Sequence, residues 1–513
     1  MNSPLPCLDV ARRAVPIVRL RKIDTVEAPD WWRDTVVYQI YPVSFKDTTG
    51  NGKGDLNGIT SELQYLKDLD VEVVWLSPVY ASPMVDMGYD ISNYREIHPD
   101  FGTLEDWERM VKEARRIGLK VVMDLVVNHT SDQHEWFQDA KDGGSKKDWY
   151  IWRGKNEEGK EPNNWGAIFG GSCWEWNDKL QEYYLHVFDV SQPDLNWENP
   201  AVRDAVWDVM RVWLDKGCDG FRMDVINCIS KTPGFPDAPV VADYLLEMHE
   251  KVLQYYPNAF TVGEGPGVKN AEQALPLIQN GVPLQMLFHF EHMYIDHQPG
   301  KTCFNYKPWK LAELKDVLGH FMEFNQANGG WDSFRWANDG IYRDVSAKML
   351  ALFHATGRGT LFIYQGQEIG MANPASWNFD ELRDLEEIQH YDVIEAKNGD
   401  TQDALKQIQR IGRDNSRTPM QWSADIRKAH NGLVRGGFKM IDYENQSVYA
   451  YTRTDATGQY LVVCSFSEEE VNWVCPVDRG SLLLGNYPSQ EKEEGSMLKL
   501  KPYEGRLYYL PNN

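Results

Sequence analysis

The stretch Gly220-Phe221-Arg222-Met223-Asp224-Val225 decides the fold predicted for this chain of 513 residues. It follows an apolar helical pattern and a Lys-Gly turn, which predicts a short buried strand over 218–225 with a carboxylate near its end. Burying a charge is costly unless it is paired, and Arg222 projects from the same face of the strand as Asp224. The pair is either a salt-bridged strand end or an ionised nucleophile at the mouth of a barrel.

Strands and helices alternate along most of the chain. Strands are predicted over 36–45, 71–80, 119–128, 218–225, 259–264, 283–290 and 359–366, with helical patterns between several of them. Such alternation builds a parallel sheet, and more than six repeats favour a closed barrel. We therefore expect the α/β class and a TIM (β/α)8-type barrel over 31–129 and 198–430.

Three further segments surround the expected barrel. Residues 130–197 lose the helical period and are rich in Gly, Asn, Trp and Lys, which predicts an inserted lid after the third strand. Alternating apolar runs over 431–513 predict a C-terminal antiparallel β domain. Residues 1–30 contain no apolar run of the length of a signal peptide or membrane anchor, and we expect an N-terminal extension there.

The composition narrows the choice of partners. A net charge of −23 disfavours nucleic acid and anionic membranes, but it says little about a neutral ligand. The seven cysteines are scattered and form no CxxC pair, which is typical of a reduced cytoplasmic protein. The 19 tryptophans suit stacking on sugar rings as well as core packing. We expect a cytoplasmic enzyme or binding protein.

Reactive side chains gather at the expected strand ends: Asp86 and Tyr89 after the second strand, Asp124, Asn128 and His129 at the third, Asp224 at the fourth and Glu264 at the fifth. In a parallel barrel these ends share one rim. Glycoside cleavage needs two carboxylates, one to attack the anomeric carbon and one to protonate the leaving oxygen and later deprotonate water. We expect Arg222 to keep Asp224 ionised and an apolar strand end to raise the pKa of Glu264.

Four motifs carry a resemblance to a known family: Asp-Leu-Val-Val-Asn-His (124–129), Gln-Pro-Asp-Leu-Asn (192–196), Gly-Phe-Arg-Met-Asp-Val (220–225) and Val-Gly-Glu (262–264). Further marks are Tyr-Gln-Gly-Gln-Glu (364–368) and Ser-Arg-Thr-Pro-Met-Gln-Trp (416–422). On these motifs the chain resembles the α-amylase superfamily of retaining glycoside hydrolases. Within it, the chain is similar to the α-glucosidase and oligo-1,6-glucosidase group over nearly its whole length.

The resemblance implies an exo-acting α-glucosidase that hydrolyses terminal α-linked glucose from maltose- or isomaltose-type oligosaccharides. It implies Asp224 as the nucleophile and Glu264 as the acid/base. It also implies a closed glucose pocket formed by Asp86, Tyr89, His129, Phe188, Gln192, Arg222 and Arg417. Val225 is similar to the residue of members that accept α-1,6 links, since α-1,4 maltases of this group more often carry Thr there.

The resemblance also implies a calcium loop, with Asp47, Thr49, Asn51, Lys53 and Asp55 as the candidate ligands. Only two of these residues are carboxylates, so an empty hydrogen-bonded turn is an equal alternative. No cofactor is expected to be required, and a bound Ca²⁺ would be structural. The expected partner is a small oligosaccharide, without nucleic acid or membrane, and the expected state is a monomer.

The chain departs from the family pattern in two places. The family's third acid, in an Asn-His-Asp motif at the end of the seventh strand, belongs between Gly330 and Tyr342, where the motif is absent. We therefore expect a truncated seventh strand, with Asp332 and Asp339 as the available substitutes. A second gap follows Trp422. The alternative to an active enzyme is a non-catalytic or truncated α-glucosidase-like protein that retains only sugar or partner binding.

Overall fold

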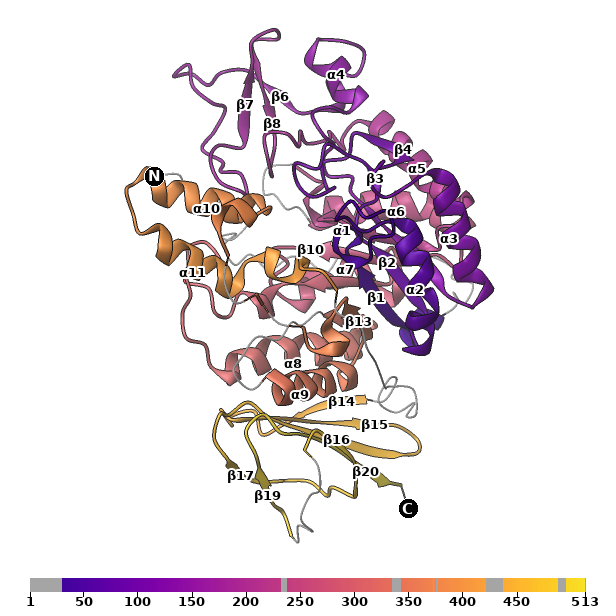
Figure 1. Cartoon of the computed structure of the whole chain (residues 1–513), viewed down its shortest axis with the longest axis vertical. Helices are drawn as coiled ribbons and strands as arrows, with labels where there is room; N and C mark the ends of the chain where they lie inside the picture. The colour runs from indigo at the N-terminus through magenta and orange to yellow at the C-terminus, as the bar shows by residue number, and fades with distance from the viewer. Residues whose placement is uncertain are drawn as a thin grey trace.

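The computed structural model describes residues 30–231, 238–334, 343–371, 373–374, 377–420, 437–487 and 495–512. Most of the expected N-terminal extension, the second gap after Trp422 and the candidate acid Asp339 lie outside these ranges. Figure 1 shows the inserted lid at one end of the long axis, the C-terminal sheet at the other end, and the barrel between them.

Eight parallel strands form the central sheet. In sheet order they are β11 (Met286–His289), β10 (Phe260–Gly265), β9 (Gly220–Met223), β5 (Lys120–Leu125), β2 (Val73–Leu76), β1 (Val36–Ile40), β13 (Thr360–Tyr364) and β12 (Ser333–Phe334). Aromatic rings meet across its interior: Trp75 stacks on Phe288 with ring centroids 5.8 Å apart, and Phe362 lies 4.7 Å from Phe288. Because β2, β11 and β13 touch in this way, the sheet curls into the predicted barrel.

The seventh barrel strand, β12, is described over Ser333 and Phe334. Ser333 and Phe334 pair with Thr360 and Leu361 at the N-terminal end of β13. The preceding residue, Asp332, is buried, and its backbone carbonyl accepts the Thr360 N–H at 3.1 Å. Asp332 therefore lies at the opposite end of the barrel from the C-terminal strand ends, where a substitute for the third acid is needed. The described range that contains this strand ends at Phe334, so the truncation of the seventh strand stays a prediction.

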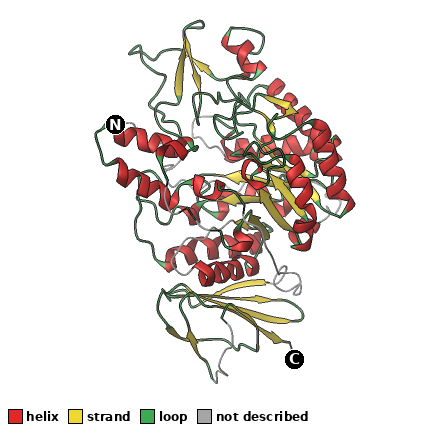
Figure 2. Ribbon diagram, viewed as in Figure 1, coloured by secondary structure: helices red, strands yellow, loops and turns green. Residues whose placement is uncertain are grey.

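Helices cover the outside of the barrel (Figure 2). They are α1 (Pro42–Phe45), α2 (Leu56–Asp68), α3 (Leu104–Arg116), α5 (Pro200–Asp215), α6 (Ala238–Lys251), α7 (Ala271–Ile278), α8 (Leu311–Asn328) and α9 (Arg343–Thr356). Helix α3 shows why they form: Thr103 and Asp106 make a capping box, and the apolar side chains of Trp107, Met110 and Ala114 lie on one buried face. After β13, α10 (Leu385–Ala396) and α11 (Thr401–Ile411) pack against each other.

The inserted lid is built from short elements. It holds α4 (Glu135–Lys141) and a three-stranded antiparallel sheet in the order β6 (Trp152–Arg153), β8 (Glu182–Leu185) and β7 (Trp174–Asn177). A hairpin of β3 (Tyr80–Ala81) and β4 (Asn93–Ile97) precedes it. An antiparallel bridge between His129 and Asp194 ties the two ends of the lid together, so the lid begins and ends beside the third barrel strand.

The C-terminal sheet is antiparallel. Its strands are β14 (Gly437–Ile441), β15 (Val448–Thr454), β16 (Gly458–Ser465), β20 (Gly505–Pro511) and β18 (Ser481–Gly485), and β17 (Val471–Val474) pairs separately with β19 (Met497–Leu500). One face packs on α8 and α9, where Leu318 and Phe353 contact the same buried cluster as Tyr451 and Val462. The predicted barrel with a C-terminal β domain is confirmed, while the exact domain boundaries stay predictions. None of the helices in the described ranges has the length and apolar character needed to cross a membrane.

Candidate active site

Arg222 on β9 is the centre of a buried charge cluster. Its Nη1 donates to Asp124 Oδ1 at 2.6 Å and to Asp224 Oδ1 at 2.7 Å, while its Nη2 pairs with Glu264 Oε2 at 2.5 Å. Asp124 lies in β5, Asp224 directly follows β9, and Glu264 lies in β10, so three neighbouring strands each supply one acid. One guanidinium thus serves three carboxylates, and the cluster has an excess of acidic groups.

This excess changes the protonation expected for Asp224. Burial raises the pKa of Asp224 well above its ordinary value, the Arg222 charge opposes this, and Glu264 and Asp124 raise it further. Burial likewise raises the pKa of Asp124 to about 6. Arg222 favours the ionised form of Asp224, as expected, but the guanidinium is divided among three acids, so the ionised state of Asp224 stays a prediction. Asp224 and Glu264 bind the same guanidinium and each is close enough to influence the ionisation of the other.

A strained turn follows Asp224. Val225 has a left-handed backbone with φ 35° and ψ 42°, a conformation that β-branched residues rarely adopt. The turn directs the backbone N–H of Val225 to Glu264 Oε2 at 3.1 Å. Because Arg222 donates to the same oxygen, Oε2 accepts two hydrogen bonds, and a proton on the Glu264 carboxyl group belongs on Oε1.

A second network lies beside this cluster. Gln192 Nε2 donates to Asp86 Oδ2 at 2.9 Å. His129 Nε2 lies 3.2 Å from the carbonyl oxygen of Tyr89, and Asn128 Nδ2 lies 3.2 Å from His129 Nδ1. Gln192 Nε2 also lies 3.2 Å from His129 Nε2, so amide donors face both ring nitrogens, which disfavours a doubly protonated imidazolium. Burial lowers the pKa of His129 to about 3, which agrees with this neutral imidazole.

Two aromatic side chains complete this part of the site. The Tyr89 hydroxyl donates to Asp124 Oδ2 at 3.3 Å, and the Phe188 ring lies 5.2 Å from the His129 ring. Phe188 also packs against Val225. The structure therefore brings these residues, predicted from distant parts of the sequence, together around the Arg222 cluster.

Arg417 lies near Asp86, but its ion pairs go to other residues. Its Nη1 donates to Asp384 Oδ2 at 2.9 Å and to Asp414 Oδ1 at 3.1 Å. Burial raises the pKa of Asp86 to about 6, and the charges of Arg413 and Arg417 oppose that rise. Arg417 therefore acts on Asp86 through its electric field, while Asp384 and Asp414 hold the guanidinium in place.

The sequence analysis missed the acids at the start of α10. Asp384 accepts the backbone N–H groups of Glu386 and Glu387 and caps the helix. Glu386 Oε1 accepts a hydrogen bond from Cys303 Sγ at 3.2 Å, and burial raises the pKa of Glu386. An Asp followed by two acids before a helical run is a helix-start signal that could have located this cluster.

The predicted calcium loop is a hydrogen-bonded turn. Asp47 Oδ1 accepts the N–H of Thr49 at 2.8 Å, Asn51 Oδ1 accepts the N–H of Lys53 at 2.8 Å, and Asp55 Oδ1 accepts the N–H of Gly58 at 2.8 Å. Both carboxylates accept backbone hydrogens, as expected of the hydrogen-bonded turn, and each has further lone pairs that could bind a cation. No group of three or more His, Cys, Asp or Glu side chains in the described ranges could hold a metal. Structural calcium stays a prediction.

The chain matches a known protein family and several known proteins over most of its length. The alpha-amylase catalytic-domain family matches residues 39–445. The chain is 41% identical over 558 residues to an oligo-1,6-glucosidase of Parageobacillus thermoglucosidasius, covering 93% of this chain and 98% of that protein. It is 37% identical over 549 residues to an α-glucosidase of Schizosaccharomyces pombe, covering 90% and 94%. A crystal structure of Bacillus licheniformis trehalose-6-phosphate hydrolase matches with a TM-score of 0.87 and 34% identity, covering 94% of this chain and 100% of that one.

The relatives also contain residues that this chain lacks. The alignment with the oligo-1,6-glucosidase is 558 residues long and therefore exceeds the 513 residues of the chain. Whether the third acid is among the lacking residues stays a prediction. With the family matched over most of the length, the predicted membership is confirmed, and the chain belongs to the alpha-amylase family of glycoside hydrolases, with oligo-1,6-glucosidases and α-glucosidases among its relatives.

Proposed function

We propose that this protein is a retaining, exo-acting α-glucosidase that hydrolyses terminal α-linked glucose from maltose- or isomaltose-type oligosaccharides. The observation that carries the proposal is the closeness of Asp224 and Glu264, which both pair with the Arg222 guanidinium, at 2.7 Å and 2.5 Å. Inverting enzymes hold their two carboxyl groups further apart, because a water molecule must fit between one of them and the sugar. Closely spaced carboxyl groups therefore favour retention.

In this mechanism Asp224 attacks the anomeric carbon while Glu264 gives a proton to the glycosidic oxygen, so that the bond to the leaving sugar breaks and a glycosyl-enzyme forms. Glu264 then takes a proton from water, the water oxygen attacks the anomeric carbon, and Asp224 leaves. Two donors hold Glu264 Oε2, so Oε1 is the oxygen that exchanges this proton. Arg222 remains charged and stabilises whichever carboxylate is ionised.

The remaining site residues would hold the terminal glucose. Asp86 and Gln192, already hydrogen-bonded to each other, offer an acceptor and an amide to sugar hydroxyls, and His129 offers a neutral imidazole. The aromatic rings of Tyr89 and Phe188 supply apolar surface for the C–H face of the sugar. Several relatives named oligo-1,6-glucosidase, together with Val225 after the nucleophile, favour tolerance of α-1,6 links.

A non-catalytic sugar-binding protein is the second candidate, and one observation favours it. Asp332 lies at the wrong end of the barrel to act as the third acid. Removing one group that stabilises the transition state costs on the order of a hundredfold in rate or more. The two candidates therefore differ in turnover and not in binding.

Hydrolysis of a chromogenic α-glucoside distinguishes them. We expect the chain to release the chromophore faster than an Asp224→Asn variant, which keeps the size of the side chain but lacks the nucleophilic carboxylate. A second version, in which a full seventh strand with an Asn-His-Asp end is restored, is expected to be faster still. Activity equal to the Asp224→Asn background in the chain, with recovery only on restoration, would establish the non-catalytic alternative.

A further inference from the structure

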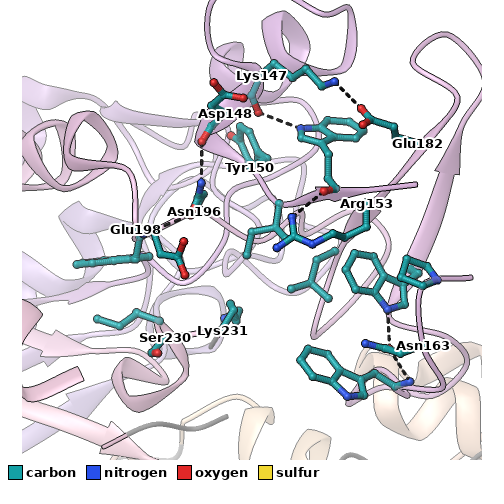
Figure 3. Close-up of a pocket in the computed structure, with 18 of the residues that line it drawn as sticks. Lys147, Asp148, Tyr150, Arg153, Asn163, Glu182, Asn196, Glu198, Ser230 and Lys231 are labelled. Atoms are coloured by element: carbon teal, nitrogen blue, oxygen red, sulfur yellow. Dashed lines mark hydrogen bonds and ion pairs between the residues drawn. The ribbon is translucent and has the colours of Figure 1, made fainter. Parts of the chain in front are cut away.

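A cavity of about 610 Å³ lies between the inserted lid and the barrel (Figure 3). Lid residues within 147–153, 162–174 and 182–198 form most of its wall, and residues 229–231 with Tyr244 complete it from the barrel side. None of the residues predicted to bind the terminal glucose lines it. Its volume falls within the range of cavities that hold small molecules.

The apolar part of the wall is aromatic and held in place. Trp174 Nε1 donates to Asn163 Oδ1 at 2.8 Å, and Trp152 Nε1 donates to the Lys147 carbonyl at 3.0 Å. These indole N–H groups are therefore satisfied within the wall, and the rings contribute apolar surface to the cavity. Trp165 is only half-buried and adds further aromatic surface beside them.

Carboxylates lie along another side of the cavity. Asn196 Nδ2 donates to the Asp148 carbonyl at 3.0 Å and so holds the backbone of this acid. Figure 3 shows Asp148, Asn196 and Glu198 on one side of the cavity and Asn163 on the other. Asp148 and Glu198 are exposed, and neither carboxylate has an ion pair within the described ranges. These two carboxylates are available to accept hydrogen bonds from a ligand.

The charges around the cavity balance. Its basic residues are Lys147, Arg153 and Lys231, and its acidic residues are Asp148, Glu182 and Glu198. Sites for phosphate or carboxylate ligands collect an excess of Arg and Lys, which this wall lacks. We propose that the cavity is a second saccharide site for a neutral mono- or disaccharide, whose C–H faces pack on the aromatic wall and whose hydroxyls donate to Asp148 and Glu198. This binding does not depend on turnover at Asp224.

The cavity is connected to the active site through its floor. Lys231 Nζ pairs with Asp194 Oδ2 at 3.4 Å, and Asn128 Nδ2 donates to Asp194 Oδ1 at 3.0 Å. Asn128 in turn donates to the His129 imidazole. A sugar in the cavity therefore contacts a wall that is bonded to the strand end carrying the glucose-site histidine.

Calorimetric titration of the full chain with isomaltose tests the proposal. The Asp224→Asn variant is used so that the sugar is not hydrolysed, and two binding events per chain are expected. Adding Glu198→Gln or Trp165→Ala should weaken one event by about tenfold or more, because a charged acceptor or a stacking surface is lost. Adding Asp86→Ala should instead weaken the other event. Glu175→Gln, an exposed lid acid outside the cavity, should change neither.

The proposal of a second site would be refuted if isomaltose gave a single binding event, and if Asp86→Ala removed this event while Glu198→Gln left it unchanged. If the event that depends on Glu198 binds glucose 6-phosphate more tightly than glucose, the proposal that the cavity prefers a neutral sugar is refuted. Because Glu198 is exposed, its Gln variant is expected to fold, which circular dichroism checks. Absence of glucosidase activity would refute the proposed function but would leave the two-event result standing.

Discussion

Arg417 donates from Nη1 to Asp384 Oδ2 at 2.9 Å, so the cation predicted to hold the glucose is itself held by the acid that caps α10. Asp384 is 1% exposed, and its carboxylate also pairs with Arg413. Two arginines and a helix N-terminus therefore converge on one buried carboxylate, which explains why the pKa of Asp384 is lowered despite its burial.

Replacing this acid by its amide should destabilise the protein. Asp384→Asn keeps the helix cap, because Asn is as good an N-cap as Asp, but it removes the charge that neutralises Arg417. Removing one carboxylate partner of a buried cation such as Arg417 typically lowers the unfolding free energy by about 3 kcal/mol. Urea unfolding of the variant beside the parent measures this loss.

The next helix offers a matched control. Asp400 caps α11 through the N–H groups of Gln402 and Asp403, and it has no arginine partner in the described ranges. Asp400→Asn should therefore change the unfolding free energy by less than about 0.5 kcal/mol. Equal losses in the two variants would show that capping, and not the ion pair with Arg417, is what Asp384 contributes.

Arg222→Lys should abolish most of the turnover. A lysine ammonium is a single point charge on a flexible stem, so it cannot reproduce the fork that reaches Asp124, Asp224 and Glu264 together. We expect kcat/KM on a chromogenic α-glucoside to fall by about a hundredfold or more. Arg116→Lys, at an exposed ion pair on α3, is the control and should leave kcat/KM unchanged. A fully active Arg222→Lys variant would contradict the role assigned to the shared guanidinium.

Glu387 should make stability depend on pH. Its side chain is 1% exposed, its Oε1 accepts the Asp414 N–H at 2.9 Å, and burial raises its pKa from 4.5 to about 8. A carboxyl group with a raised pKa in the folded state stabilises the protein below pH 4.5 and loses this contribution as the pH rises through about 8. The parent should therefore lose about 5 kcal/mol of unfolding free energy across this window at this group.

Glu387→Gln mimics the protonated acid and should remove that loss. Urea unfolding of parent and variant at about pH 5 and about pH 9 gives the comparison, with the variant more stable than the parent only at the higher pH. If both proteins lose the same stability between these conditions, the pKa of Glu387 is not raised in the folded protein.

The barrel was predictable because its strands are short apolar runs that end at turns or acids. The errors lie where buried runs continue past a strand end. The first strand was predicted over 36–45, yet β1 ends at Ile40 and α1 begins at Pro42. Both parts are largely buried, so hydrophobicity alone does not separate them, whereas proline at the first helical position does.

The residues predicted for the active site lie close together in the structure, but their long-range electrostatics do not follow from local sequence patterns. The pair Arg222 and Asp224 is local and follows from the two-residue period of a strand. The third partner of the guanidinium, Asp124, is 98 positions away in the sequence, and no local pattern shows that it shares the same Nη1. Asp124 contributes to the raised pKa of Asp224, and the two-residue period of the strand does not reveal this long-range contact.

Val225→Thr should shift the linkage preference. Val225 is buried beside Phe188 and Cys228 and directly follows the nucleophile, and Thr has a similar shape but adds a hydroxyl. An α-1,6 link carries an additional methylene group, which an apolar methyl suits better than a hydroxyl does. We expect the ratio of kcat/KM for isomaltose to that for maltose to fall by about tenfold. Val225→Ala, which shortens the side chain without adding polarity, is the control and should lower both rates while keeping their ratio. A ratio that Thr leaves unchanged would mean that contacts further from Asp224 select the linkage.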